Sequence, residues 1–188
     1  MRIAVFGGTF DPIHLAHTRV AREAADRFGL DRVLFVPAAH PPHKQEGQTT
    51  PFEHRYRMVE LACREDPRFE ASRIEEGNGK SYTVHTLEKL RSTLDPGDEL
   101  YFLIGADAFA EIGSWHRSQD VIRMVDFIVV SRPGYQLRVP EGARVHRLET
   151  LALPLSSSDI RRQLEATGTA EGLHPAVLAY IREHGLYR

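Results

Sequence analysis

The chain has 188 residues, of which 41% are hydrophobic and 27% are charged, and its formal net charge is only −2 at pH 7. This length and apolar content predict one sizeable core and a single domain over residues 1–188, and the weak net charge gives no reason to expect a nucleic-acid partner. One cysteine excludes a disulfide within the chain and indicates a reducing, cytoplasmic compartment, and no apolar stretch approaches the roughly 20 residues that cross a membrane, so no membrane partner is expected. A homo-oligomer stays open.

Strands and helices are expected to alternate along the chain. Short apolar runs predict strands at Arg2–Phe6, Arg32–Val36, Phe69–Glu75, Glu99–Ile104, Asp126–Ser131 and Arg144–Leu148. Amphipathic segments predict helices at Leu15–Phe28, Phe52–Arg64, Thr83–Leu94, Ser157–Ala166 and Pro175–His184. Residues 37–51 are loop by composition, and a loop of this length in a compact domain is usually functional or mobile.

This alternation predicts an α/β fold with a doubly wound, Rossmann-like parallel sheet covered by helices on both faces. Ligands of such sheets bind beyond the carboxyl ends of the strands, where the strand order reverses. Four segments with unusual composition follow predicted strands, namely residues 7–17, 37–44, 105–107 and 132–134. We therefore expect these segments to gather at one edge of the sheet and to form the site.

The segment GGTFDPIHLAH, residues 7–17, indicates phosphate binding. Gly7 and Gly8 permit a sharp turn and a close approach of a ligand to the backbone. The next helix is expected to begin near His14, and a helix N-terminus attracts phosphate through its free N–H groups and its dipole. Because residues three apart share a helix face, His14 and His17 are expected to point toward the same anion.

Histidine pairs also raise a metal interpretation, because His14/His17 and His40/His43 both have the spacing H-x-x-H. A zinc ion needs three or four converging ligands, and the second pair flanks two prolines in a loop, so the sequence gives no such convergence. No metal ligand among the side chains is therefore predicted. A Mg²⁺ ion delivered with ATP would need few protein ligands, because it keeps most of its waters.

Residues 7–17 resemble the first motif, (H/T)-x-G-H, of the nucleotidyltransferase superfamily, and the longer pattern resembles the bacterial nicotinate-mononucleotide adenylyltransferases. Further motifs follow in that family's order and approximate spacing: PPHK at 41–44, SYT at 81–83, GAD at 105–107, Trp115, SRPG at 131–134, SSSDIR at 156–161 and YIREHGLY at 180–187. The resemblance thus covers nearly the whole chain. It implies the nucleotidyltransferase fold, with C-terminal helices from about residue 157 completing an ATP site.

The resemblance also implies a reaction and a set of site residues. Nicotinate mononucleotide would attack the α-phosphorus of ATP, giving deamido-NAD and pyrophosphate, with Mg²⁺ as the cofactor. The catalytic residues implied are His14, His17, Lys44 and Arg161. The ATP-binding residues implied are Gly7, Gly8, Thr9, Phe10, Gly105, Asp107, Ser156, Ser157 and Ser158, and the residues implied for nicotinate mononucleotide are Thr83, Trp115 and Arg132. The loop that carries Lys44 is expected to order over the phosphates.

Two other functions stay open from the sequence. One is phosphopantetheine adenylyltransferase, against which the PPHK loop, Trp115 and the C-terminal motif argue. The other is a catalytically silent nucleotide sensor, which would not need four cationic or hydrogen-bonding residues at the phosphates. Three positions depart from the family pattern: Ala16 replaces a glycine, His85 an aspartate and Ser158 a threonine.

Overall fold

The computed structural model describes residues 1–41, 44–45, 47–77, 79–151 and 153–188. The strands are β1 (Arg2–Gly8), β2 (Arg32–Pro37), β3 (Phe69–Ala71), β4 (Glu99–Gly105), β5 (Asp126–Ser131) and β6 (Arg144–Glu149). The helices are α1 (Leu15–Phe28), α2 (Phe52–Cys63), α3 (Thr83–Arg91), α4 (Ala106–Ala110), α5 (Ser118–Met124), α6 (Ser157–Thr167) and α7 (Pro175–Glu183), with a 3₁₀ turn at Ile112–Ser114. No helix among the described residues is both long and apolar enough to cross a membrane.

The six strands form one parallel sheet in the order β3-β2-β1-β4-β5-β6. The chain runs outward from β1 to β3, and then returns to pair β4 with the other side of β1. The strand order therefore reverses between β1 and β4, which is where doubly wound sheets bind ligands. The predicted α/β doubly wound fold is confirmed.

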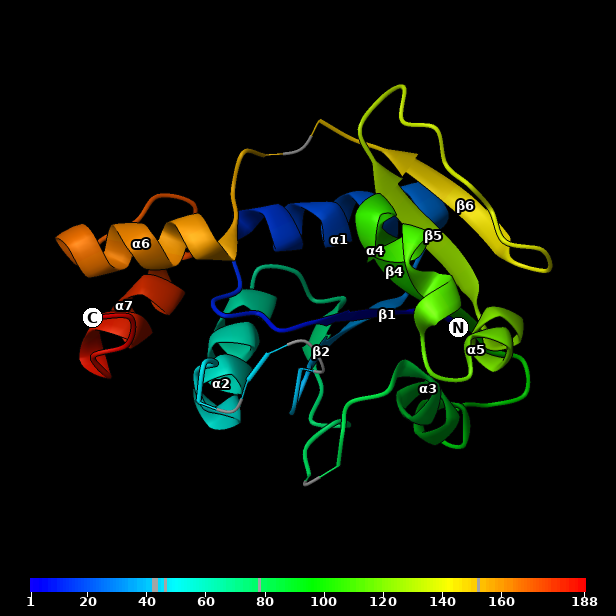
Figure 1. Ribbon diagram of the computed structural model, residues 1–188, viewed down its shortest axis with the longest axis horizontal. Coiled ribbons are helices and arrows are strands. Elements are labelled where there is room, and N and C mark those ends of the chain that lie inside the picture. Colours follow the sequence, from blue (N-terminus) through cyan, green and yellow to red (C-terminus); the bar gives the residue numbers. More distant parts are fainter. Residues whose placement is uncertain (42–43, 46, 78, 152) are drawn as a thin grey trace.

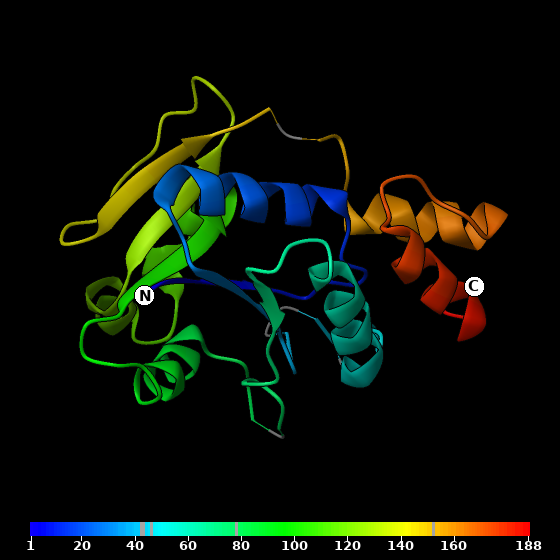
Figure 2. The same ribbon diagram turned by 180° about the vertical axis from the view of Figure 1, so that it is seen from behind.

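Two apolar layers cover the two faces of the sheet, and successive strand residues alternate between them. In β1, Ala4 faces the layer that contains α1, α2, α6 and α7, while Ile3 and Val5 face the layer of α3, α4 and α5. Figures 1 and 2 show these helices on opposite sides of the sheet, with α6 and α7 standing together beyond its end. Because both faces are covered, the inner strands β1, β2, β4 and β5 are nearly continuous apolar runs, whereas the edge strand β6 is mostly polar.

Several predicted boundaries hold to within a residue because local chemistry determines them. Helix α1 begins after His14 and ends at Gly29, whose φ of 61° places it in the left-handed region that glycine tolerates. Helix α6 begins after Ser156, whose Oγ accepts a hydrogen bond from the Asp159 N–H at 3.1 Å.

Other predictions need correction. Strand β3 ends at Ala71 rather than Glu75, and α3 ends at Arg91 rather than Leu94. The short helices α4 and α5 and the 3₁₀ turn were not predicted, because five to seven residues are too few to show a helical period. Gly7 and Gly8 do not form the turn: they pair in register with Val36 and Pro37 as the last residues of β1.

Candidate active site

The turn between β1 and α1 is made by the residues that follow the two glycines. Phe10 has a φ of 51°, and the Asp11–Pro12 peptide bond is cis. The Phe10 ring is 3% exposed and lies over Gly8, where an added Cβ would be 3.1 Å from the ring carbon Cζ. The packing of Phe10 therefore favours glycine at position 8, and the buried Phe10 ring is not available to a ligand.

His14 and His17 lie together at the start of α1, as predicted. Their rings stack with centroids 3.8 Å apart and an interplanar angle of 23°. The backbone N–H of His14 donates to Nδ1 of His17 at 3.1 Å. His14 is buried, and its Nδ1 has no hydrogen-bond partner among the described residues. Unpaired buried atoms of this kind are few in proteins, and a functional role is one reason for them.

Both imidazoles are neutral near pH 7. Burial lowers the pKa of His14 to about 4. Burial, and secondly the neighbouring His14, lower the pKa of His17 well below its usual value. Because Nδ1 of His17 accepts a hydrogen bond, its proton resides on Nε2. His17 therefore presents an uncharged N–H donor.

The N-terminus of α6 is hydrogen-bonded to the same turn. Ser157 Oγ donates to the Pro12 carbonyl at 2.9 Å. Arg161 donates from Nη1 to the Asp11 carbonyl at 2.8 Å and from Nη2 to Ser158 Oγ at 3.2 Å. Two helix N-termini, each a favourable place for an anion, thus lie side by side although about 140 residues separate them in the sequence.

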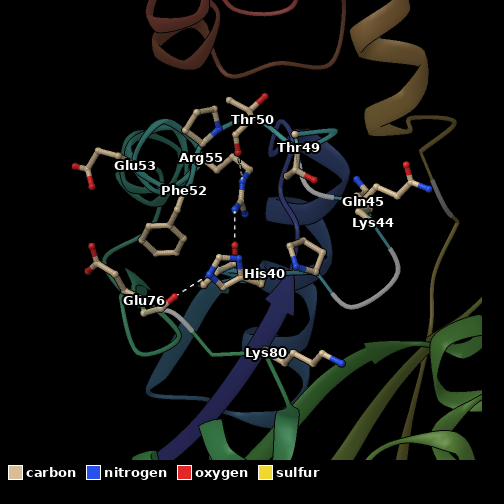
Figure 3. A pocket seen from close by; sticks show the side chains of 15 residues that line it. His40, Lys44, Gln45, Thr49, Thr50, Phe52, Glu53, Arg55, Glu76 and Lys80 are labelled. Carbon is tan, nitrogen blue, oxygen red and sulfur yellow. Dashed lines mark hydrogen bonds between the residues drawn. The ribbon is translucent and has the colours of Figure 1, made fainter.

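The loop after β2 borders a cavity of about 810 Å³. His40, Lys44 and Lys80 line it, and Figure 3 shows how they lie around it. Two contacts with residues 77–81 hold His40 in place. Its backbone N–H donates to Ser81 Oγ at 3.1 Å, and its ring Nε2 lies 2.9 Å from the Gly77 carbonyl oxygen. Pro42 and His43 lie outside the described residues, as does the expected ordering of this segment. Of the phosphate candidates, Lys44 lines this cavity, whereas His14, His17 and Arg161 do not.

Arg55 is a residue of this site that the sequence interpretation missed. It is 1% exposed and donates hydrogen bonds to the carbonyls of Thr50 at 2.7 Å, Thr9 at 2.9 Å and Ala38 at 2.7 Å. One guanidinium therefore joins the loop after β1 to the loop after β2, and Figure 3 shows it beside Thr50. A signal was present in the sequence, because Arg55 shares a helix face with the apolar residues at 58, 59 and 62.

The candidates for the second substrate lie at the neighbouring strand ends. Thr83 is the first residue of α3, and half-buried Trp115 packs edge-on against Phe102 with centroids 5.9 Å apart. Their sequence neighbours Tyr82 and His116 contact each other with ring centroids 4.4 Å apart, which brings Thr83 and Trp115 to one place.

Three further candidates lie at the ends of β4 and β5. Gly105 ends β4, and Asp107 is exposed in the first turn of α4. A Cβ added at Gly105 would meet nothing within 4 Å. Arg132 is exposed directly after β5.

Within the part of the chain that the structure describes, no group of three or more His, Cys, Asp or Glu side chains could hold a metal ion. His14 and His17 stack on each other, and His40 contacts the Gly77 carbonyl. The donors at the phosphate candidates are instead N–H groups and a guanidinium, which fit an anion.

The fold is that of the doubly wound α/β class of nucleotide-binding proteins, and the donors at the two joined helix N-termini are a candidate site for an anion. Comparison with known proteins agrees. A model of the cytidylyltransferase-like family matches residues 5–163. A probable nicotinate-nucleotide adenylyltransferase of Solibacter usitatus is 60% identical over 187 residues, and one of Thermus thermophilus is 46% identical over 190 residues, each covering 100% of both chains.

Among solved structures, the Plasmodium falciparum nicotinic acid mononucleotide adenylyltransferase complexed with NaAD has a TM-score of 0.79, covering 99% of this chain and 97% of that one. Its sequence is only 22% identical, so this likeness supports the fold alone. The chain belongs to the cytidylyltransferase-like family and, within it, to the nicotinate-nucleotide adenylyltransferases.

Proposed function

We propose that this protein transfers the adenylyl group of ATP to nicotinate mononucleotide, giving deamido-NAD and pyrophosphate in NAD biosynthesis. The observation that carries the proposal is the joining of the α1 and α6 N-termini through Ser157 and Arg161 at the end of β1. A triphosphate between them meets free N–H groups from two helices and the donors of His17 and Arg161.

The chemistry requires positioning more than a base. A phosphate oxygen of nicotinate mononucleotide attacks the α-phosphorus of ATP, and the bond to the bridging oxygen of pyrophosphate breaks. The attacking phosphate is already ionised near pH 7, so no side chain has to remove a proton. The protein must hold the two phosphates in line and offset the charge that develops on the oxygens.

His17 is the donor to the α-phosphate in this proposal. Its neutral Nε2–H is directed by the bond at Nδ1 and needs no protonation event before the reaction. His14, stacked on it, contacts the neighbouring phosphates. A preorganised donor of this kind stabilises the transition state more than the ground state.

Lys44 and Arg161 supply positive charge to the β- and γ-phosphates, and the serines at 156–158 supply the N-terminus of α6. Gly7, Gly8, Thr9 and Phe10 offer backbone to the nucleotide. Gly105 and Asp107 face the adenosine ribose. The Asp107 carboxylate can accept hydrogen bonds from the ribose hydroxyls. On this assignment, the C-terminal helices complete the ATP site of a single domain.

A divalent cation, Mg²⁺, accompanies ATP. The residues fit an ion that is held by phosphate oxygens and water, because the described donors at the site are N–H groups and cations rather than a cluster of carboxylates. The ion would neutralise part of the triphosphate charge.

Trp115 stacks on the electron-poor pyridine ring, and Thr83 with the N-terminus of α3 binds the pyridine carboxylate. Arg132 adds positive charge from the end of β5. A carboxylate gains charge-assisted hydrogen bonds from N–H donors, whereas an amide satisfies them poorly. We therefore expect nicotinate mononucleotide to be preferred over nicotinamide mononucleotide.

The test is pyrophosphate release from ATP with three acceptors: nicotinate mononucleotide, nicotinamide mononucleotide and phosphopantetheine. The expected result is the highest kcat/KM with nicotinate mononucleotide. Equal values for the first two would remove the specificity claim. Transfer to phosphopantetheine, or no release with any acceptor, would overturn the proposed function.

A further inference from the structure

The buried carboxylate of Asp11 lies at the centre of the contacts around the phosphate candidates. Asp11 is 3% exposed. Its Oδ2 accepts from the Thr50 N–H at 3.1 Å, and its Oδ1 accepts from the hydroxyl of Tyr187. Its backbone carbonyl accepts from Arg161. A negative charge therefore lies next to residues that are expected to bind phosphate. Because burying an unpaired charge is costly, the groups around the carboxylate must satisfy it with hydrogen bonds.

Tyr187 reaches Asp11 through an unusual backbone conformation. After α7 the chain turns back at Gly185, with a φ of 61°, and Tyr187 itself has a φ of 57°. A bulky residue rarely adopts the left-handed region, and it persists there only where the surroundings determine it. Burial, and secondly the Asp11 charge, raise the pKa of Tyr187, so its hydroxyl remains a donor at physiological pH.

Arg55 holds the same turn from its other side. It binds the carbonyls of Thr9 and Thr50, the residues that flank Asp11 in space. All its described hydrogen bonds go to backbone carbonyls, so none of them occupies the carboxylate. The hydroxyl of Tyr187 is therefore the side-chain donor that satisfies Asp11.

We propose that Tyr187 is a positioning residue for the triphosphate, and that it acts through Asp11. Its hydroxyl occupies the Asp11 carboxylate, so that the Arg161 guanidinium binds the Asp11 backbone carbonyl and Ser158 Oγ rather than the carboxylate, and keeps its remaining donors for phosphate. This inference rests on the proposed function, because it takes Arg161 to be a phosphate ligand. Under this proposal, the C-terminal segment supports ATP binding although Tyr187 does not contact the reacting groups.

Loss of the hydroxyl has two consequences in the same direction. The carboxylate loses a charge-assisted hydrogen bond and becomes free to pair with Arg161, whose Nη1 already lies at the Asp11 backbone. The uncovered negative charge also repels the incoming triphosphate. Both effects weaken ATP binding, and neither acts on nicotinate mononucleotide.

The chain offers a matched control. Tyr180 lies on α7, and its hydroxyl contacts Nδ1 of His54 on α2 at 2.8 Å. Tyr187→Phe and Tyr180→Phe therefore each remove one tyrosine hydroxyl that holds the C-terminal segment to the rest of the protein. Only the first of these hydroxyls contacts Asp11.

The experiment measures kcat, both KM values, the melting temperature and calorimetric binding of a non-hydrolysable ATP analogue for the two variants. We expect Tyr187→Phe to weaken binding of the analogue and raise the KM for ATP roughly tenfold, with the KM for nicotinate mononucleotide unchanged. Tyr180→Phe is expected to lower the melting temperature about as much as Tyr187→Phe does, but to change ATP affinity less than about twofold. Equal effects of the two variants on ATP affinity would overturn the proposal.

A double-mutant cycle tests the route through Asp11. In an Asp11→Asn background the buried charge is gone, so Tyr187→Phe should add less than about a twofold change. Additive effects would contradict the route. If Tyr187→Phe is too unstable to assay, Asp11→Asn alone must leave ATP binding unchanged or tighter, because it removes the charge that would pair with Arg161, and weakened affinity would then overturn the proposal. Absence of transfer by the wild-type protein would instead overturn the proposed function.

Discussion

The two halves of the candidate site are held in different ways. The phosphate half, which comprises residues 7–17, 156–161 and Tyr187, is joined by hydrogen bonds from buried or half-buried groups to backbone carbonyls and to Asp11. In the ring half, which comprises Thr83, Trp115 and Arg132, the segments of Thr83 and Trp115 are joined by the contact of Tyr82 with His116 and by exposed ion pairs. One such pair links Arg117 to Glu88 at 2.8 Å, with side chains 42% and 43% exposed.

This difference has a physical consequence. Hydrogen bonds to buried backbone determine a single geometry, because leaving a buried partner unsatisfied is costly. An exposed ion pair contributes little, so the ring half depends on side-chain contacts that can adjust. We infer that the phosphate half is preorganised for a developing charge, and that the ring half selects the second substrate.

The largest expected effect is on the phosphate half. His17→Ala removes one preorganised donor and should reduce kcat by roughly 10²–10³, while ATP affinity falls much less because Arg161 and two helix N-termini remain. The melting temperature should fall modestly, since the substitution removes the stacking on His14 and the acceptor of the His14 N–H. Turnover, ATP affinity and melting temperature of this single variant are the measurements.

The control for this variant is His146→Ala. His146 lies on β6 beside Asp126, the residue that begins β5. It is therefore at the amino ends of the strands, away from the candidate site at their carboxyl ends. We expect normal turnover from it. Near-normal turnover of His17→Ala would remove the catalytic role, and a large loss of its thermal stability would instead indicate that His17 holds the turn together.

A second expected effect is a pH dependence of stability from the same half. Burial lowers the pKa of His14 from 6.5 to about 4. Between these two values the unfolded chain binds the proton and the folded protein does not, so the free energy of unfolding falls as the pH falls from 6.5 to 4. The contribution is at most about 3 kcal/mol, and it is fully present above pH 6.5. His17, whose pKa is also lowered, acts in the same direction.

Chemical unfolding of the wild type and of His14→Gln at several pH values between 7 and 4 checks this expectation. The variant cannot take up the proton, so its stability should decline less steeply over this range. The comparison concerns slopes, because the substitution also changes stability at neutral pH. Exposed His116, replaced by glutamine, is the control, and its slope should follow the wild type. Parallel slopes for wild type and His14→Gln would contradict the buried neutral imidazole.

The smallest expected effect concerns the ring half. Trp115→Leu should raise the KM for nicotinate mononucleotide roughly tenfold through lost stacking and leave the KM for ATP unchanged. Steady-state kinetics with each substrate varied gives the answer, and the fluorescence of this single tryptophan should respond to nicotinate mononucleotide in the wild type. Phe28→Leu, a half-buried aromatic at the end of α1, is the control. An equal change in both KM values would place Trp115 in the core rather than in a substrate site.

The order of strands and helices was predictable because each element carries a local pattern. Gly29 and Ser156 mark helix boundaries by their own conformation and hydrogen bonding, and the apolar strands indicate a parallel sheet. The pairing of His14 with His17 was predictable for the same reason, since spacing along one helix determines it. Their roles, and those of the other site residues, stay predictions.

Contacts between distant segments were not predictable from any local pattern. The two glycines were expected to make the turn, whereas they continue β1 and leave the left-handed conformation to Phe10, because the buried Phe10 ring needs the space over Gly8. From its neighbours in the sequence alone, Arg55 is expected to be an exposed polar residue on an amphipathic helix. Its burial is favourable only because three loop carbonyls converge on its guanidinium in the folded protein.

The alternation of strands and helices, the positions of the helix starts and the family resemblance all follow from the amino-acid sequence. The contact of the α6 N-terminus with the first turn and the contact of Tyr187 with Asp11 are visible only in the folded chain. The difference comes from the separation of the interacting residues along the sequence. Capping, periodicity and turn conformation depend on residues a few positions apart, whereas a hydrogen bond between residues 11 and 187 exists only after the sheet and its two layers of helices have brought them together.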